Sequence, residues 1–485
     1  MSGAWKGLVL RDERHYGDRV FPCHAGRPEN LAALIATTVD RHGDDEAIVA
    51  GGRRLTFREV DRLAGNVAGN LAARGIKAGD RIALLLCNCP EFVIYAMAAI
   101  RLGAIAVPLG ARLKAPELDY ALNDCAAAAL VYESEYAGNL PDPALLPNLR
   151  LRILIDGATS GAEPCSAFLN SAVPPSHQAD EEDTAFILYT SGTTGQPKGA
   201  LLTHLGIIHS ATNFVACLGL GTSSRGGERA ILTVPAAHVT GLVALLFTML
   251  RCGGCTIMMR EFKARDFLAL AAAERLTYTL MVPAQYALCL MQQDLAAHDL
   301  SSWRIGAFGG APMPEATIAA LARTWPDLVL VNGYGATETT SPTALMPLGL
   351  NTAHPDSVGQ IVPGGAVRIV DDTGAAVPPG AAGEIWIKGA MVVPGYWNRP
   401  DADRAEFSDG FWHSGDIGSL DAAGFLRVLD RKKDMINRAG YKIYSAEVEN
   451  VLLHHPGIVE AAIIGSPDPV LGERVKAFIR RRDDR

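Results

Sequence analysis

The sequence predicts an α/β protein: a large N-terminal domain built on parallel sheets, a β-rich subdomain and a small α+β domain at the C-terminal end. Three observations predict this arrangement. Strand and helix patterns alternate near the N-terminus, three apolar strands end in glycine-rich turns, and short strands replace the alternation from residue 359 onward. At 485 residues the chain is long enough to form more than one domain and to bury a sizeable core.

The alternation is clearest in the first quarter of the chain. Thr56 and Glu59 have the spacing of a capping box, and apolar residues follow them with helical periodicity. Residues 81–86 then read as a strand, 90–101 as a helix and 104–108 as a second strand. A strand–helix–strand unit of this length predicts parallel strands in one sheet.

The middle of the chain carries two further expectations about structure. Residues 136–182 are richer in Pro, Ser and acidic residues and are expected to form a surface excursion. Thr203 is expected to cap a helix. The apolar face of this helix would carry Ile207, Ala211, Phe214, Val215 and Leu218.

Composition and charge narrow the class of protein. The content of 49% hydrophobic and 20% charged residues is ordinary for a globular enzyme, and a net charge of −8 argues against a nucleic-acid surface. Nine cysteines do not resemble a disulfide framework, and Cys252 and Cys255, with no second CxxC, are expected to pack between strands. Neither a signal peptide nor a membrane span is recognisable, so we expect a cytoplasmic location.

Residues 185–199 have the composition of a polyphosphate-binding loop. An apolar strand, 185–188, runs into a segment rich in glycine and hydroxyl residues that ends in a lysine. This segment contains Thr190, Ser191, Gly192, Thr193, Thr194, Gly195 and Lys198. Glycines let backbone N–H groups converge on an anion, and the lysine adds a point charge. The spacing differs from the common P-loop, and an ordinary surface loop is the alternative.

Two more strands end in glycine-rich turns, at 305–314 and 328–340. Ligands in open α/β sheets bind beyond the carboxyl ends of strands, so the three turns predict one shared cleft. The second turn brings together Tyr334, Thr337 and Glu338. They offer a flat face for a base, a donor to phosphate and an oxygen ligand for Mg²⁺.

The string YTSGTTGQPKG, with YGATE further on, resembles the motifs of the adenylate-forming superfamily of acyl-CoA synthetases, nonribosomal adenylation domains and firefly luciferase. The resemblance covers nearly the whole chain in family order and is strongest to a stand-alone fatty-acid or aryl-acid CoA ligase. It implies ATP, Mg²⁺ and CoA as cofactors and co-substrate. A carboxylic acid would become an acyl-adenylate and then a CoA thioester, with release of pyrophosphate and AMP.

The same resemblance implies roles for particular residues. Tyr334 would stack on adenine, Thr337 would contact the α-phosphate and Glu338 would bind magnesium. Thr190, Lys198 and His238 would be catalytic residues together with Thr337 and Glu338. The ribose would be held by Asp416, from HSGDIG, and by Arg431, from LDRKKD. Ser414 and Asp430 are mild departures from the family pattern there. Further nucleotide contacts would come from the 191–195 loop, Gly309, Gly310, Ala311, Pro312, Asn332 and Gly333.

The resemblance also places an acyl pocket. His238 stands among apolar residues, where a histidine is often a core residue. In the family, this position is that of an aromatic residue that gates the acyl pocket. The lining would be apolar and small, and no cation stands ready for a second carboxylate. It comprises Phe214, His238, Val239, Gly241, Gly309, Gly310 and Thr339 to Ser341. We therefore expect a medium-chain fatty acid or an aryl acid.

The C-terminal part carries the remaining expectations. Residues 1–429 would form the adenylation domain, 430–434 a hinge centred on Lys433, and 435–485 a partial mobile domain. Gly440 would border the pantetheine tunnel used in thioester formation. The C-terminal lysine of the family is not found, since Lys476 stands in the context of the preceding strand. Either the sequence is truncated or adenylation is inefficient.

Two alternatives stay open at this level. The same motifs serve enzymes that load a carrier-protein thiol. In the second alternative, the chain is a nucleotide-binding protein that is inactive in adenylation because the C-terminal lysine of the family is absent. The expected partners are a small carboxylic acid and CoA, with no nucleic acid and no membrane span, and a homodimer is left open.

Overall fold

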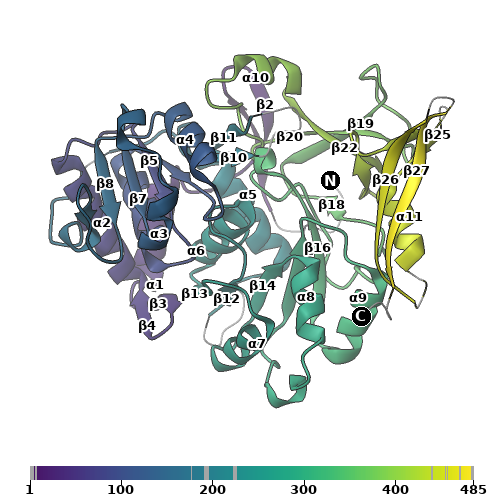
Figure 1. Ribbon diagram of the computed structural model, residues 1–485, viewed down its shortest axis with the longest axis horizontal. Helices are drawn as coiled ribbons and strands as arrows, with labels where there is room; N and C mark the ends of the chain where they lie inside the picture. The colour runs from purple at the N-terminus through teal and green to yellow at the C-terminus, as the bar shows by residue number, and fades with distance from the viewer. Residues whose placement is uncertain are drawn as a thin grey trace.

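The computed structural model describes residues 5, 8–175, 177–190, 196–221, 227–438, 441–453, 455, 457–468 and 471–481. The described chain forms a seven-stranded sheet, a 14-stranded sheet, a four-stranded sheet and a two-stranded ribbon. Figure 1 shows the seven-stranded sheet at one end of the molecule and the C-terminal sheet at the other. The predicted α/β class is confirmed. No helix in these described ranges has the length and apolar content needed to cross a bilayer.

The seven-stranded sheet has the order β11-β10-β6-β5-β7-β8-β9, and only the β10–β11 pair is antiparallel. Its strands are β5 Arg81–Leu85, β6 Ile105–Pro108, β7 Ala129–Tyr132, β8 Leu151–Leu154, β9 Glu163–Pro164, β10 Thr184–Thr190 and β11 Lys198–Thr203. The helices between β4 and β7 are α2 Phe57–Ala73, α3 Pro90–Leu102 and α4 Ala115–Asp124. The predicted strand–helix–strand unit is confirmed, as is the capping box of Thr56 and Glu59.

The 14-stranded sheet has a parallel half and an antiparallel half. The parallel half, with β4 at its edge, contains β3 Glu46–Ala50, β4 Arg53–Thr56, β12 Arg229–Leu232, β13 Cys255–Met258, β14 Tyr278–Met281, β15 Ile305–Gly309 and β16 Val329–Tyr334. The antiparallel half contains β17 Ala344–Leu345, β18 Gly359–Ile361, β19 Gly365–Val370, β20 Gly383–Gly389, β21 Phe407–Ser408, β22 Phe411–Leu420 and β23 Phe425–Arg431. The expected β-rich segment is therefore joined to the large sheet by continuous hydrogen bonding through β17 and β18.

The helices that accompany the large sheet come from several parts of the chain. They are α1 Leu31–His42, α5 His204–Leu218, α6 Thr248–Cys252, α7 Ala264–Ala273, α8 Pro283–Leu290, α9 Glu315–Thr324 and α10 Pro400–Glu406, with a π-helix at Thr240–Phe247. Thr203 caps α5 as predicted, its hydroxyl accepting a hydrogen bond from the Gly206 N–H at 3.1 Å. Of the five apolar residues expected on one face, four are buried and Val215 is half-buried, but burial is not limited to that face, because most other residues of α5 are buried as well.

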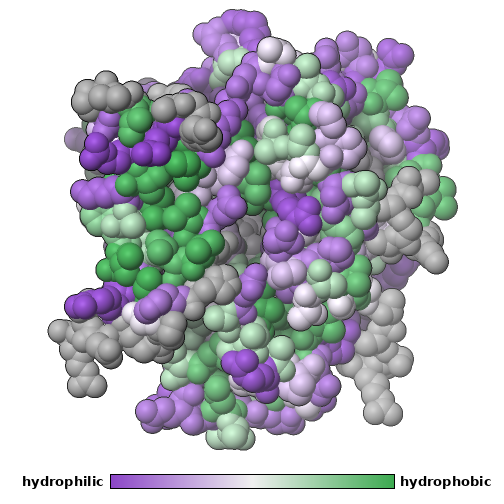
Figure 2. Space-filling model, turned by 90° about the vertical axis from the view of Figure 1, so that its right-hand side faces the viewer, coloured by the Kyte–Doolittle hydropathy of each residue, from purple (hydrophilic) through white to green (hydrophobic). Residues whose placement is uncertain are grey.

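The C-terminal sheet consists of β24 Ile436–Arg438, β25 Tyr441–Ile443, β26 Ile458–Asp468 and β27 Gly472–Arg481, with helix α11 Ser445–Leu453. Figure 2 views the molecule from this side and shows apolar areas among polar surroundings. The two long strands expose several apolar side chains. These include Val459, Ile464, Phe478 and Ile479.

Two other expectations about local structure are corrected. The segment 136–182 is not only a surface excursion, since β8 within it is a parallel strand whose Ile153 is fully buried. Its apolar run LRIL was long enough for a core strand. Cys252 ends α6 and Cys255 begins β13, so these residues flank a helix-to-strand turn instead of packing between strands. All nine cysteines are free thiols.

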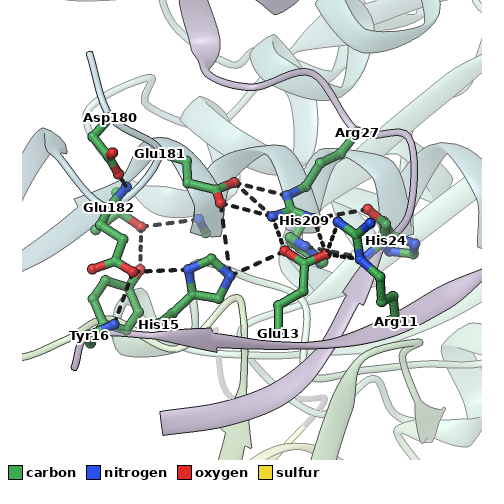
Figure 3. A network of polar contacts seen from close by, with 12 residues as sticks. Arg11, Glu13, His15, Tyr16, His24, Arg27, Asp180, Glu181, Glu182 and His209 are labelled. Carbon is green, nitrogen blue, oxygen red and sulfur yellow. Dashed lines mark hydrogen bonds and ion pairs between the residues drawn. The ribbon is translucent and has the colours of Figure 1, made fainter. Parts of the chain in front are cut away.

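A polar network ties the N-terminal ribbon, β1 Leu10–His15 and β2 Arg19–His24, to the base of the β10–β11 hairpin (Figure 3). Arg27 donates to Glu13 at 2.6 Å and to Glu181 at 2.8 Å. Glu182 accepts from the Tyr16 backbone N–H at 3.0 Å. Arg27, Arg11 and their hydrogen bonds hold the pKa of the Glu13 carboxyl at about 2, despite the opposing effect of burial. The network fixes the segment that leads into β10.

A buried amide, that of Asn88, which follows β5, forms one of the contacts between the two large sheets. Its Nδ2 donates to the carbonyls of Leu232, Val234 and Met259 at 3.2, 3.1 and 3.0 Å. Its Oδ1 accepts from the Ala236 N–H at 2.8 Å. A single side chain thus holds the end of β12 and the segment after it against the seven-stranded sheet.

Asn88→Ala should therefore destabilise the fold by about 3 kcal/mol, because several buried backbone groups lose their partner. The matched control is Asn66→Ala. Asn66 is 9% exposed against 8% for Asn88, and its side-chain amide makes one hydrogen bond, to the Leu169 carbonyl at 2.9 Å. The control should lose about 1 kcal/mol in chemical denaturation. Equal losses in the two variants would contradict the cross-link.

Candidate functional site

A cleft of about 2060 Å³ lies where the carboxyl ends of β10, β15 and β16 meet the β22–β23 hairpin. Residues from many separate regions of the sequence line it together. The predicted site residues among them are Thr190, Lys198, His238, Val239, Gly310, Ala311, Pro312, Asn332, Gly333, Tyr334, Thr337, Glu338, Asp416, Arg431 and Lys433. The structure thus brings the glycine-rich turns to one place, as the strand-end argument predicts.

The phosphate-loop candidate is the connection of an antiparallel hairpin. Thr190, at the end of β10, and Lys198, at the start of β11, are register partners, and the Thr190 hydroxyl lies 3.4 Å from the Lys198 carbonyl. Thr190 and Lys198 therefore flank the loop on its two sides. Ser191, Gly192, Thr193, Thr194 and Gly195 lie outside the described residues.

Lys198 belongs to a cluster of charged and aromatic side chains at the cleft. Its ammonium forms an ion pair with Glu406 and lies 4.4 Å from the ring centre of Tyr396. The Tyr396 hydroxyl is 2.6 Å from Glu406 Oε2 and 3.1 Å from Glu338 Oε1. Trp412 Nε1 donates to the same hydroxyl at 3.3 Å. A phenol carries one proton, so it serves one carboxylate at a time.

Glu338 is buried at this cluster. Burial raises the pKa of its carboxyl above the usual 4.5, Glu406 acts in the same direction, and the Tyr396 hydroxyl and Lys198 oppose them. A buried carboxylate that is incompletely compensated by its neighbours is stabilised in its charged form by a divalent cation. Glu338 therefore fits the role of an oxygen ligand for Mg²⁺ at this end of the cleft.

Tyr334 and Asp416 meet although they are far apart in the sequence. The Tyr334 hydroxyl donates to Asp416 Oδ2 at 2.5 Å, and Arg431 Nε lies 2.8 Å from Asp416 Oδ1. Asp416 and Arg431 are register partners on β22 and β23. Burial raises the pKa of the Asp416 carboxyl, while Tyr334 and Arg431 oppose the shift. The arrangement presents a carboxylate, a phenol ring and a guanidinium on one wall.

The GGAP turn follows the end of β15, next to the end of β16 that carries Tyr334. Gly309 pairs with Gly333 of the next strand, and a side chain at 309 would meet the Gly333 carbonyl oxygen at 2.5 Å. The strand pairing therefore requires glycine at 309. Gly310 has a φ of +77° and lines the cleft. Gly309 itself does not line it, which corrects the expectation that its missing side chain leaves room for the acyl group.

The predicted acyl pocket is only partly assembled at the cleft. His238 is exposed there beside Val239, directly before the π-helix. Desolvation, and secondarily the charge of Arg112, lowers the pKa of the His238 imidazole below 6.5, so it is neutral at pH 7. Phe214, Gly241 and Thr339 do not line the cleft. Phe214, on α5, is buried in the hydrophobic core. Gly241 packs on the Pro235 carbonyl, and Thr339 is buried beside Ala336.

The connection to the C-terminal sheet also borders the cleft. Lys433 lines it, and the neighbouring Lys432 donates to Glu384 at 2.9 Å. Glu447 and Leu453 of α11 face the same space. Gly440 lies outside the described residues. The hinge assignment and the domain boundaries stay predictions.

Three residues of the cluster were missed by sequence reasoning: Tyr396, Glu406 and Trp412. Glu406 ends α10, and Tyr396 precedes this helix in a loop. None of the three belongs to a motif with a recognisable spacing. Tyr396 reaches Lys198 because its segment pairs with β11, through the Ala200–Tyr396 bridge and the hydrogen bond from the Trp397 N–H to the Gly199 carbonyl. The sequence offers no signal that could have found them.

Comparison with known proteins agrees with this geometry. Residues 35–397 match the AMP-binding enzyme family, and residues 447–485 match the AMP-binding enzyme C-terminal domain. The chain is 37% identical over 445 residues to a feruloyl-CoA synthase of Amycolatopsis sp, covering 89% of this chain and 85% of the relative. It is 34% identical over 431 residues to the long-chain-fatty-acid–CoA ligase FadD13 of Mycobacterium tuberculosis, covering 88% and 83%.

Among solved structures, the anthranilate CoA ligase AuaEII in complex with anthranoyl-AMP superposes with a TM-score of 0.86 at 26% identity, covering 94% of this chain and 87% of that one. The chain belongs to the AMP-binding enzyme family. Within it, the chain is an AMP-forming acyl-CoA synthetase, a class of ligase that uses ATP, Mg²⁺ and CoA.

Tyr396→Phe should move the acidic limb of the pH–rate profile to higher pH. The Tyr396 hydroxyl lowers the pKa of Glu338, so its removal raises that pKa further and protonates the carboxyl at a higher pH. A loss of about 1 kcal/mol, or about fivefold in rate, is expected at pH 7 in acid-dependent ATP–pyrophosphate exchange.

The control for this variant is Tyr286→Phe, which removes a buried hydroxyl that donates to the Ala307 carbonyl at 2.9 Å, away from the cleft. Its pH profile should match that of the parent enzyme. An unmoved acidic limb in Tyr396→Phe would contradict the coupling between Tyr396 and Glu338.

Proposed function

We propose that the chain activates an aryl or medium-chain monocarboxylic acid with ATP and transfers the acyl group to the thiol of CoA. The observation that supports this most is the make-up of the cleft. Lys198, Thr337 and the buried Glu338 line the same cleft as His238, Val239 and a set of other apolar residues. A polyphosphate and an apolar acid can therefore meet in one space.

In the first half-reaction the substrate carboxylate attacks the α-phosphorus of ATP in line and expels pyrophosphate. No general base is needed, since a carboxylate is already ionised at pH 7. The charge that develops on the phosphoryl oxygens needs fixed donors. We propose that Lys198, the Thr337 hydroxyl and residues 191–195 supply them. Mg²⁺ bound at Glu338 would neutralise phosphate charge during this step.

Before the chemistry, Lys198 must exchange its ion pair with Glu406 for the triphosphate. Glu406 can keep the Tyr396 hydroxyl as a partner when the lysine leaves, because that hydroxyl is only 2.6 Å away. Tyr334, Asp416 and Arg431 would hold the nucleoside, the carboxylate accepting from the ribose hydroxyls. The neutral His238 would close over the bound carboxylate without pairing with its charge.

In the second half-reaction the CoA thiol attacks the acyl carbonyl carbon and AMP leaves. We propose that residues 435–485 move as a unit about Lys433 between the two steps, with 1–429 as the fixed domain and 430–434 as the hinge. Gly440 would then lie beside the pantetheine arm. Lys433 lines the cleft, which fits a pivot close to the nucleotide.

The proposed acid class is supported by the cleft and by the relatives. The lining of the cleft includes apolar residues. These are Pro108, Leu109, Leu113, Val239 and Met313, among others. Arg112 is the charged side chain that acts on the His238 imidazole. Feruloyl and anthranoyl groups, which the relatives' names specify, are aryl acyl groups with one carboxyl carbon to activate.

The proposal predicts ATP–pyrophosphate exchange that depends on an added acid. In a panel of aryl acids, fatty acids of increasing length and dicarboxylates, aryl or medium-chain acids should support exchange and dicarboxylates should not. CoA should then release AMP and form the matching thioester. Preferential activation of a dicarboxylate would overturn the substrate class. Nucleotide binding without exchange for any acid would overturn the enzymatic proposal.

Asp416→Asn should raise the KM for ATP about 10- to 100-fold, because the amide loses the charge that pairs with Arg431 and one acceptor for the ribose. The KM for the acid should change little. The control is Asp421→Asn, on the same hairpin, where the aspartate accepts from the Phe425 backbone N–H at 2.9 Å outside the cleft. An unchanged KM for ATP in Asp416→Asn would exclude the proposed ribose contact.

We further propose a cytoplasmic location, which the nine free thiols support because disulfides seldom form in a reducing compartment. The homodimer left open by the sequence stays a prediction that light scattering of the purified enzyme can test.

A further inference from the structure

We propose that Cys87, Cys89 and Glu133 form a binding site for a thiophilic divalent cation such as Zn²⁺, separate from the ATP cleft. One ligand atom from each residue, the two Sγ atoms and a carboxylate oxygen, lies within 4.8 Å of the other two. Thiolate and carboxylate groups in this number are ordinary zinc ligands, and a protein or solvent oxygen can complete a tetrahedral site.

The topology explains why these residues meet. Strands β5 and β7 are adjacent and parallel, with Leu85 opposite Tyr132. Cys87 follows the end of β5 and Glu133 follows the end of β7, so both lie at the same edge of the sheet. Cys89 is the N-cap residue of α3 and makes no side-chain capping bond. Its thiol is therefore available, at a helix N-terminus that favours negative charge.

The site already attracts a cation in the form of a guanidinium group. Glu133 is 1% exposed, and its Oε1 accepts from the Cys87 N–H at 2.7 Å. Its other oxygen forms an ion pair with Arg260, which reaches across from the end of β13. Arg260 Nη1 also lies 2.6 Å from Cys87 Sγ. Arg260 thus occupies two of the atoms that a metal would use.

Arg260 can be displaced because it is held from the solvent side. Its side chain is 51% exposed, and it has a second, exposed partner in Glu135 at 2.7 Å. A metal ion that replaces the guanidinium keeps a positive charge beside the buried Glu133, which would otherwise be left unpaired. The two thiol protons pass to solvent as the Cys87 and Cys89 sulfur atoms bind the metal.

A second cluster with metal-ligand chemistry, Glu13, His15 and Cys23, is a weaker candidate. Figure 3 shows the Glu13 carboxylate already engaged by Arg27. The Arg27 side chain is only 7% exposed and is also bound to Glu181, so it has no solvent route by which to leave. A cation there would lie beside a buried positive charge. The accessible guanidinium of Arg260 distinguishes the two clusters.

Oxidation of the Cys87–Cys89 pair is the other chemistry that two neighbouring thiols allow. A thiolate is the reactive species in that reaction. A bound metal deprotonates a coordinating thiol outright. The buried Glu133 carboxylate beside the two sulfur atoms favours a cation there, which oxidation of the thiols would not supply.

The test is titration of the full-length, chelator-treated enzyme with Cd²⁺ alone, followed by the ultraviolet thiolate-to-metal charge-transfer band. We expect the band to saturate at one equivalent and the melting temperature to rise with added Cd²⁺ or Zn²⁺. Cys87→Ser and Cys89→Ser should each weaken binding at least tenfold. Both should keep acid-dependent pyrophosphate exchange, which shows that they fold.

Two controls make the result specific. Cys252→Ser, which removes a half-buried thiol elsewhere, should leave the titration unchanged, and so should Cys23→Ser. Arg260→Gln should tighten Cd²⁺ binding, because the competing guanidinium is gone. Absence of the band, its loss in Cys23→Ser instead of Cys87→Ser and Cys89→Ser, or weaker binding in Arg260→Gln would overturn the proposal.

Discussion

The ion pair between Lys198 and Glu406 is the contact on which the organisation of the cleft most depends. Lys198 is the first residue of β11, in the seven-stranded sheet. Glu406 is the last residue of α10, which precedes β21 and β22 of the 14-stranded sheet. Tyr396 lies between them and extends the contact to the buried Glu338. In a partly buried setting a lone charge is costly, so the lysine and the two carboxylates constrain one another's positions. The same charges are those that ATP and Mg²⁺ must engage.

Strand ends supply the second organising constraint. In both parallel sheets the chain leaves the carboxyl end of a strand through residues that carry polar chemistry, and neighbouring ends bring these residues together. This rule places Thr190, Gly310 and Tyr334 around the nucleotide cleft. It equally places Cys87 and Glu133 at the carboxyl ends of β5 and β7, on the same edge of the seven-stranded sheet as Thr190, where we propose a metal site. Asn88, between the two cysteines, bonds across to the segment that leads to His238.

The AMP-binding family relationship makes the adenylation chemistry secure, and the structure adds how this chain supports it. Tyr396, Glu406 and Trp412, which surround Lys198, are not part of any motif recognised in the sequence. They set the charge state of the motif residues: burial raises the pKa of Glu338, and Tyr396 opposes that shift. Differences among relatives in such supporting residues would tune activity without altering the motifs.

The sequence by itself determined the fold class, the strand–helix–strand unit from Arg81 to Pro108, the α5 cap at Thr203 and the motif residues that line the cleft. These depend on local periodicity, capping and glycine-rich strand ends, which are written in short segments. It did not determine the buried strand β8, the burial of Phe214 on all sides, or the approach of Gly309 to Gly333. Nor did it indicate Tyr396, Glu406 and Trp412. Only tertiary structure decided these, because each depends on which distant segments pack against it.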